Sequence, residues 1–314
     1  MLEILSITGP IFITIGVGYV FTRFRVFSAS DVVAMSKFVA TLALPALLFA
    51  AIARREVSSI FMLEYMLPYG VGTFTLLVFV LFYLMVFRDK ALTEAAADTL
   101  GAASPNTGFV GYPILLLTFP GIAGHVLAMN FLIENLVIIP TLLILAELGR
   151  QNAVGVAAAI IRVVMQTVKN PIVIGVVLGL AASISGVALP GPVNASIDLF
   201  AKSATAVALL VIGGSLVGQS IKGIRLRLLR IVFGKLFLHP LFVFAAIVFL
   251  PVLGLGHMSD EYSTAAILMA GMPIMGIYVV LAQRYGHGGI AAVAQISTTV
   301  LSFFTLTGLL YVLQ

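Results

Sequence analysis

Apolar segments of about twenty residues, the length of a membrane-crossing helix, follow one another along this chain. They run over residues 4–22, 31–52, 65–87, 93–118, 123–147, 171–187, 194–218, 231–251, 261–284 and 289–312. Only 9% of the 314 residues are charged, whereas an average soluble domain carries about 25%. The sequence therefore predicts an all-α membrane protein with ten transmembrane helices, spans 1 to 10 in chain order, surrounded by the lipid bilayer.

Several classes of site have no candidate residues in this sequence. The absence of cysteine removes disulfides and thiol chemistry, and the four histidines lack the spacing of metal ligands, so no metal is predicted. No GxxxxGK[ST] loop indicates ATP as the direct energy source, and no HExxH or paired-aspartate motif indicates an intramembrane enzyme. We expect no cofactor. The first apolar segment follows Glu3 instead of a basic region, so no cleavable signal peptide is expected.

The basic residues between the spans predict the orientation. Twelve of them follow odd-numbered spans, and only Arg54 and Arg55 lie in connections on the other side. The twelve are Arg23, Arg25, Arg88, Lys90, Arg150, Arg162, Lys169, Lys222, Arg225, Arg227, Arg230 and Arg284. Because basic residues concentrate in cytoplasmic loops, we expect both termini outside. The net charge of +5 then reflects topology, and no nucleic-acid partner is predicted.

Two of the spans are interrupted by proline and glycine, at residues 104–108 (SPNTG) and 271–276 (GMPIMG). A proline in mid-span removes a backbone hydrogen bond, and backbone opened at membrane depth must be satisfied by protein or by a water-lined cavity. Breaks of this kind mark binding sites in carriers. The alternative is that Pro105 and Pro273 are merely tolerated kinks. Other mid-span prolines are expected to be such kinks: Pro45, Pro113, Pro140 and Pro240.

The two halves of the chain resemble each other. Residues 35–44 of span 2 align with 200–209 of span 7. At nearly the same offset, Ala102, Pro105 and Gly108 of span 4 align with Ala270, Pro273 and Gly276 of span 9. Because each half holds an odd number of spans, the second copy is inverted. We therefore expect two inverted five-helix repeats, with broken spans 4 and 9 crossing at the membrane centre. The positive ends of their half-helices would point at the crossing, which suits an anion.

Polar side chains gather at the first break. Asn106 offers an amide, Ser104 and Thr107 offer hydroxyls, and Gly108 lets a ligand approach the backbone closely. Gly276 is the counterpart of Gly108 in the second break. We expect these residues to contact substrate. The alternative is that the three polar side chains only cap the second half-helix.

Two lysines inside spans are functional candidates, because a charge at membrane depth is costly. Lys37 in span 2 and its repeat counterpart Lys202 in span 7 would bracket the crossing from opposite sides and balance the charge of a bound anion. The alternatives are snorkelling of Lys37 to the interface and a local ion pair of Lys202 with Asp198, four residues earlier.

Two acidic residues are candidates for carrying a coupling proton. Glu134 lies near the centre of span 5, and Asp98 lies one to two turns before the break of span 4. A structural hydrogen bond is the alternative for Glu134. Lys235 is near enough to the cytoplasmic end of span 8 for us to expect snorkelling, and His239 is expected to be hydrogen-bonded rather than catalytic.

Four stretches resemble those of a known family: residues 36–49 (SKFVATLALPALLF), 104–113 (SPNTGFVGYP), 201–210 (AKSATAVALL) and 271–286 (GMPIMGIYVVLAQRYG). Together with the ten spans, they resemble the auxin efflux carrier family, whose bacterial members are often labelled malonate or dicarboxylate permeases. The resemblance covers essentially the whole chain. It implies a fold like that of bile acid and sodium/proton carriers and a carboxylate-bearing substrate at the crossing. Asn106 matches the family's substrate-contacting asparagine, and Pro105 and Pro273 match its crossover prolines.

The resemblance also implies how the chain is divided and where it resides. Scaffold helices would occupy 1–57 and 171–220, transport-domain helices 58–149 and 221–314, and a cytoplasmic linker 150–170, with the transport domain moving as in an elevator mechanism. Lys37 falls where plant members carry a basic residue. The long loop of many plant exporters is absent, so we expect a compact prokaryotic carrier in the cytoplasmic (inner) membrane. A homodimer formed through the scaffold is an expectation from the family alone.

These observations predict a secondary transporter of small organic anions, carboxylates such as malonate or auxin-like acids, that works by alternating access as a proton-coupled carrier or a uniporter. A sodium-coupled, bile-acid-like symporter is an alternative and would need several acidic and amide ligands. The available ones are sparse: Glu134, Asn135, Asn130 and Gln295. A non-transporting membrane sensor of carboxylates is a further alternative, because binding and transport use the same site.

Overall fold

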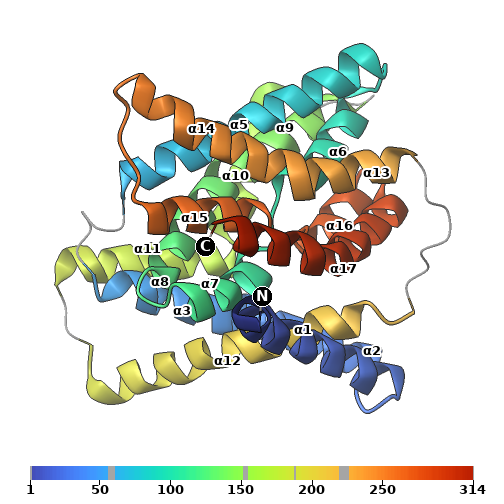
Figure 1. Cartoon of the computed structure of the whole chain (residues 1–314). Coiled ribbons are helices and arrows are strands. Elements are labelled where there is room, and N and C mark those ends of the chain that lie inside the picture. Colours follow the sequence, from blue (N-terminus) through green and yellow to red (C-terminus); the bar gives the residue numbers. More distant parts are fainter. Residues whose placement is uncertain (1, 56–60, 151–154, 187–188, 219–225, 314) are drawn as a thin grey trace. The chain divides into compact units, whose positions relative to one another are not determined.

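The computed structural model describes residues 2–55, 61–150, 155–186, 189–218 and 226–313 (Figure 1). Every element with regular hydrogen bonding in these ranges is helical, apart from one isolated bridge between Pro105 and Ile274. Some predicted features lie outside the described residues, namely the basic residues Lys222 and Arg225 and positions 151–154 of the expected linker.

Six helices are long and apolar enough to cross a membrane. They are Ala29–Ala53 (α2, η1 and α3), Leu63–Phe87 (α5 and η2), Ala123–Leu148 (α8, η4 and α9), Gly191–Ser215 (α12), Leu226–Val252 (α13, η5 and α14) and Gly288–Leu313 (α17). A seventh results if α10 (Val156–Val168) and α11 (Pro171–Ser185) form one broken span. The six coincide within a few residues with predicted spans 2, 3, 5, 7, 8 and 10. The prediction of an all-α, multi-pass membrane protein is therefore confirmed.

The remaining predicted spans fall on shorter or broken helices. Predicted span 1 corresponds to α1 (Leu2–Arg23), and predicted span 6 corresponds to α11. The fourth consists of α6 (Leu92–Ala103), η3 (Thr107–Gly111) and α7 (Tyr112–Thr118), and the ninth of α15 (Asp260–Ala270) and α16 (Ile277–Gln283). The total of ten spans and the inverted repeat stay predictions.

A five-residue π-helical turn precedes each of four mid-span prolines. The turns are η1 (Val39–Ala43) before Pro45, η3 before Pro113, η4 (Glu134–Ile138) before Pro140 and η5 (Gly234–Leu238) before Pro240. Proline has no N–H for the carbonyl four residues earlier, and its ring collides with that carbonyl in an α-helix. A wider turn relieves the collision. One further turn, η2 (Tyr83–Phe87), is π-helical without a following proline.

The helices pack as two compact units. Unit 1 contains Met1–Met62, Thr107–Met129 and Val168–Gln219, and unit 2 contains Leu63–Asn106, Asn130–Thr167 and Ser220–Gln314. This grouping differs from the predicted scaffold and transport domains, because α7 and most of α8 belong to unit 1. Packing alone does not show which part moves, so the division into scaffold and transport domain stays a prediction.

In unit 1, α1 lies along α12 (Figure 1), and glycines allow the close approach. A Cβ atom on Gly213 would overlap the carbonyl oxygen of Ile15, and one on Gly18 would overlap that of Leu210. Small residues at such contacts are typical of helix packing in membranes, where backbones come close and van der Waals contact drives association. The lack of side chains at these glycines therefore lets the two backbones come into direct van der Waals contact.

In unit 2, α5 packs against α14 and α6 packs against α9. A charged group also fastens α10 to this unit. The Glu147 carboxylate, at the end of α9, accepts from Arg162 of α10 (3.2 Å) and from the Tyr285 hydroxyl (3.2 Å). Burial and the neighbouring Glu147 charge raise the pKa of Tyr285 to about 12. The helix found within the expected 150–170 linker is thus tied to unit 2 by an ion pair.

Replacing Gly213 by alanine is expected to destabilise unit 1, because the new methyl group must displace the α1 backbone at Ile15. Overpacking of this kind costs about 1–3 kcal/mol. The measurement is the thermal midpoint at which detergent-purified protein loses its monodisperse peak on size exclusion. Gly16→Ala is the matched control on α1, because nothing lies within 4 Å of a Cβ atom there. Equal midpoints for the two variants would contradict the close packing of α1 and α12.

Candidate functional site

The two broken helices meet in unit 2 as a short antiparallel bridge. Pro105 pairs with Ile274. The Asn106 N–H donates to the Pro273 carbonyl (2.7 Å), and the N–H of Met275 donates to the carbonyl of residue 104 (3.1 Å). The first half-helix ends because Ser104 is extended, with φ −112° and ψ 92°, as a residue before proline usually is. The breaks that the sequence analysis expected to cross therefore lie side by side.

This bridge uses backbone donors that the breaks release. Pro105 and Pro273 have no N–H to offer, and the Ile274 N–H donates to Thr298 Oγ1 of α17 at 3.2 Å. The two N–H groups paired across the bridge are occupied as well. These three donors are consequently not free to hold an anion, so a ligand at the crossing has to be bound by side chains or by donors beyond the bridge.

The predicted contact residues of the first break are buried. Ser104, Asn106, Thr107 and Gly108 all lie in the interior, whereas Gly276 is exposed at the start of α16. The Ser104 hydroxyl has no hydrogen-bond partner among the described residues. Leaving a buried hydroxyl unpaired is unfavourable, so this position is suited to a water molecule or a polar ligand atom. The chain passes from unit 2 to unit 1 directly after Asn106.

Unit 1 contains a cavity of about 420 Å³ that holds one of the two candidate lysines. Small-molecule sites usually enclose roughly 300–1,000 Å³. Its lining comes from α3, α7, the start of α8 and α12, and consists of Leu47, Ala50, Ala51, Arg55, Tyr112, Leu116, Pro120, Gly124, Asp198, Ala201, Lys202 and Thr205. The cavity is thus large enough for a small organic molecule and carries charged groups on an apolar wall.

The charges around this cavity favour an anion. Asp198 pairs with Arg54 at 2.7 Å, and Arg55 donates to Nδ1 of His125 at 3.2 Å, since a guanidinium can only donate. Lys202 forms no ion pair within the described part of the chain, and the alternative Lys202–Asp198 pair is not present there. Arg55 and Lys202 are therefore the cations that the cavity presents to a ligand.

Lys37 lies in a different place. It occupies the last turn of α2, is exposed, and does not line the cavity that contains Lys202. Of these two repeat counterparts, Lys202 is the one that lines this cavity, and the expectation that they bracket the crossing from opposite sides stays a prediction.

A buried polar cluster in unit 2 was missed by the sequence analysis. Three residues of α5 one turn apart, Tyr65, Tyr69 and Thr73, bond in that order to Asn130 Oδ1 (2.8 Å), Glu134 Oε1 (2.8 Å) and His239 Nε2 (3.0 Å). All six residues are buried. The available signal was the four-residue spacing of hydroxyl-bearing side chains in an otherwise apolar span, which aligns them on one helix face.

Lys235 belongs to this cluster, and the expectation that it snorkels is wrong. Its side chain is 0% exposed, and Nζ lies 2.5 Å from the Ala270 carbonyl oxygen and 2.8 Å from Nδ1 of His239. Ala270 is the last residue of α15, so the ammonium caps the negative end of a half-helix whose carbonyls the break leaves open. The nearby Glu134 carboxylate provides an attractive counter-charge.

With Lys235 in its charged form, the hydrogen bonds also define the tautomer of His239. An ammonium has no acceptor, so Nδ1 of His239 accepts from Lys235. The imidazole is therefore neutral and donates from Nε2 to Thr73 Oγ1. His239 acts as a hydrogen-bonded link in the cluster, as expected from the sequence.

Asp98, one of the two proton-carrier candidates, is held by an arginine. Nε and Nη2 of Arg227 donate to both of its carboxylate oxygens at 2.6–3.0 Å. A bidentate charge-assisted pair stabilises the ionised carboxylate. Glu134 accepts from the neutral hydroxyl of Tyr69 and also interacts electrostatically with Lys235, so its proton-carrying role stays a prediction.

Comparison with known proteins finds transporters. The sequence profile of a family described as "Membrane transport protein" matches residues 7–310. A protein named "Putative malonate transporter" from Rhizobium meliloti (strain 1021) is 30% identical over 321 aligned positions, covering 100% of this chain and 97% of the relative. "Uncharacterized transporter YfdV" from Escherichia coli (strain K12) is 27% identical over 301 positions, covering 94% of this chain and 92% of the relative. The similarity extends over essentially the whole length of each protein.

Replacing Lys235 by methionine is expected to destabilise unit 2. The variant keeps the length of the side chain but leaves the Ala270 carbonyl and the His239 ring without their donor, at a cost of about 1–3 kcal/mol for each unsatisfied group. The measurement is the thermal midpoint of the detergent-purified protein. Arg88→Met, at an exposed position, is the control and should melt like the parent. A parental midpoint for Lys235→Met would show that the ammonium is not part of the buried cluster.

Proposed function

Since the chain belongs to the family of membrane transport proteins that includes the auxin efflux carriers, we propose that it is a secondary transporter of small organic anions that carry carboxylates. Family membership and the relatives named as transporters make it a multi-pass membrane transporter and not an enzyme. The relative named for malonate supports malonate as the first substrate to test.

The observation that carries the proposal is the cavity of unit 1 with its two cations. Arg55 and Lys202 line one cavity of about 420 Å³, and the only described carboxylate in its lining, that of Asp198, is already paired with Arg54. A dicarboxylate could place one carboxylate on each cation, because charge-assisted hydrogen bonds from guanidinium and ammonium groups are the strong ones. The apolar remainder of the wall would accommodate the carbon skeleton.

Substrate contacts at the break form the second part of the proposal. We assign direct contact to Asn106 and Thr107, with Ser104, Gly108 and Gly276 shaping the site. The unpaired hydroxyl of Ser104 supports a polar ligand there. Lys202 and Lys37 would balance the substrate charge in different states of an alternating-access cycle, in which the predicted transport domain shifts against the scaffold.

Proton coupling through Glu134 is the proposed energy source, with uniport as the alternative. Glu134 is buried beside Lys235, so a gain or loss of its proton would alter the balance of charge inside the cluster. We further propose the cytoplasmic membrane of a prokaryote as the location, both termini outside, and a homodimer as the assembly.

Transport of malonate by the purified protein in liposomes is the direct test. Currents on a solid-supported membrane and uptake of radiolabelled malonate should both saturate without sodium. Lys202→Gln is expected to raise the half-saturating concentration about tenfold or more, because a hydrogen bond to a charged group contributes about 1.5–3 kcal/mol. Asn106→Ala should weaken binding in the same assay.

Arg25→Gln is the control, because its side chain is exposed and does not line the cavity. Parental half-saturation in both Lys202→Gln and Asn106→Ala would contradict the assigned contacts. Uptake that requires sodium would favour the bile-acid-like symporter, and binding of malonate without any uptake would favour a sensor.

Glu134→Gln is expected to remove the pH dependence of malonate uptake, because glutamine keeps the acceptor for Tyr69 but cannot exchange a proton. The measurement is the initial uptake rate in liposomes at several pH values with and without a pH gradient. Glu261→Gln, at an exposed position in the first turn of α15, should keep the parental profile. A Glu134→Gln variant with the parental pH profile would rule out this residue as the proton carrier.

A further inference from the structure

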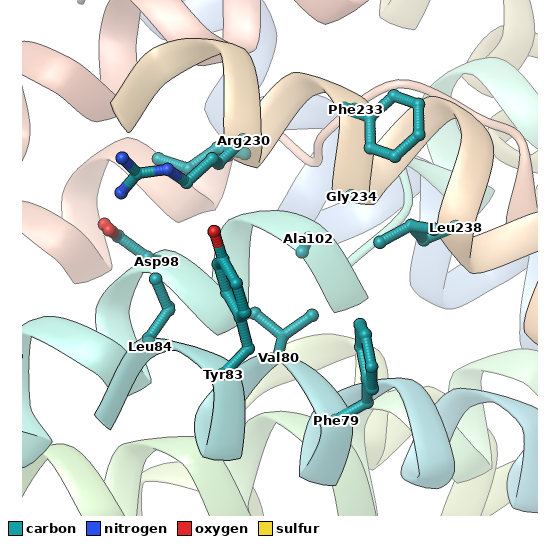
Figure 2. A pocket seen from close by; sticks show the side chains of 11 residues that line it. Phe79, Val80, Tyr83, Leu84, Asp98, Ala102, Arg230, Phe233, Gly234 and Leu238 are labelled. Atoms are coloured by element: carbon teal, nitrogen blue, oxygen red, sulfur yellow. The ribbon is translucent and has the colours of Figure 1, made fainter. Parts of the chain in front are cut away.

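A second cavity, within unit 2, has one polar and one apolar end (Figure 2). It encloses about 220 Å³ between α5, η2, α6, α13 and η5. Side chains with polar groups, Tyr83, Asp98 and Arg230, lie toward one end, and Phe79 and Leu238 lie toward the other (Figure 2). A ligand that satisfies both ends is amphipathic. The volume is below the roughly 300–1,000 Å³ of a complete small-molecule site, so it would take one part of a larger molecule.

Among the charged residues at the polar end, one cation, Arg230, remains without an ion-pair partner in the described part of the chain. Arg227 holds the Asp98 carboxylate and also contacts Glu94 at 2.8 Å, and Lys90 contacts Glu94 at 2.8 Å. Both carboxylates are thus neutralised by two other cations. Arg230 forms no ion pair with any residue that the structure describes. The polar end therefore selects an anionic group, which would bind at Arg230.

A second, shallow and open groove also includes Arg230. It has a volume of about 430 Å³ and is lined by Leu229, Arg230, Val232, Phe233 and Phe237. The cavity and the groove share Arg230 and Phe233. Two apolar grooves that meet at one unpaired cation match a molecule with two apolar chains on one anionic head group. A small carboxylate or a single-chain amphiphile would leave one of the grooves empty.

The rings around these grooves are accessible from the side of the helices. Phe79, Phe233 and Phe237 are 46%, 53% and 52% exposed, and the last two stack with their centroids 5.4 Å apart. All three belong to helices long and apolar enough to cross a membrane, where exposed rings face lipid chains. Acyl chains could therefore enter the grooves laterally from the bilayer.

The predicted orientation places this end of unit 2 at the cytoplasm, because the connections before α6 and before α13 carry basic residues. Anionic lipid head groups of the cytoplasmic leaflet attract such residues, and basic pockets between transmembrane helices on this side bind them. We propose that Arg230 binds the phosphate of an anionic phospholipid, with its two acyl chains on either side of Phe233. This site shares no residue with the cavity of Lys202, so binding at the two can be tested separately.

Native mass spectrometry of the full-length protein tests this site. The protein in detergent is equilibrated with phosphatidylglycerol or with phosphatidylcholine of the same acyl chains, and bound lipid is counted. We expect phosphatidylglycerol to bind more tightly than phosphatidylcholine. Arg230→Gln should weaken phosphatidylglycerol binding about fivefold, as expected for the loss of one basic residue near a lipid head group. It should weaken phosphatidylcholine binding less, because the choline cation offsets the charge of the phosphate.

Arg88→Gln is the matched control, an exposed arginine at the same end of unit 2 that lines neither groove, and should bind phosphatidylglycerol like the parent. Leu238→Trp keeps every charge but fills the apolar end, and should also weaken binding. It serves as the test if Arg230→Gln is not monodisperse.

Three outcomes would overturn the proposal. The first is equal affinity of the parent for the two lipids, and the second is parental phosphatidylglycerol binding by Arg230→Gln or, where that variant is not monodisperse, by Leu238→Trp. The third is laurate binding as tightly as phosphatidylglycerol and being lost in Arg230→Gln, which would assign the site to single-chain carboxylates instead.

Discussion

Satisfaction of backbone hydrogen bonds at the two broken helices is the constraint on which the interior of unit 2 depends. Proline removes donors at Pro105 and Pro273, and membrane-depth backbone has no bulk water to replace the lost bonds. The breaks solve this problem by pairing with each other. Thr298 accepts from the remaining N–H, and Lys235 caps the open carbonyl end of α15. The helices that carry Thr298 and Lys235 are thus positioned by the backbone groups that the breaks leave unpaired.

The same requirement explains why a charged cluster lies deep in an apolar unit. Lys235 needs an acceptor, and the end of α15 supplies one together with the negative end of a helix dipole. Its charge in turn orients His239 and attracts Glu134, which accepts a hydrogen bond from the Tyr69 hydroxyl of α5. Burying any one of these polar side chains alone would be unfavourable, but together they satisfy each other's hydrogen bonds as a network. A proton added to or removed from Glu134 would therefore act on the group that supports the break.

Prediction from the sequence succeeded where the signal was local. Continuous apolar segments marked six helices within a few residues. The four prolines that were expected to be kinks each follow a π-helical turn, which the sequence analysis did not predict. Prediction failed for side chains whose bonding partner is far away in the sequence. Lys235 was expected to snorkel because nothing near it in sequence reveals the open carbonyl of Ala270. The ion pair of Lys202 with Asp198, four residues away, was considered as an alternative, but Asp198 pairs with the remote Arg54.

Composition and periodicity alone established that the chain is an all-helical membrane protein and where its helices break, because hydropathy and proline act within one turn of their own position. Folding in three dimensions selected which groups pair: the two breaks with each other, Lys235 with the end of α15, and Asp98 with Arg227. It also placed Lys202, which forms no ion pair with any described residue, in one cavity with Arg55. These outcomes depend on which helix faces approach each other. Hydrogen bonds and ion pairs act over a few ångströms in space, between residues that lie from tens to well over a hundred positions apart in the chain.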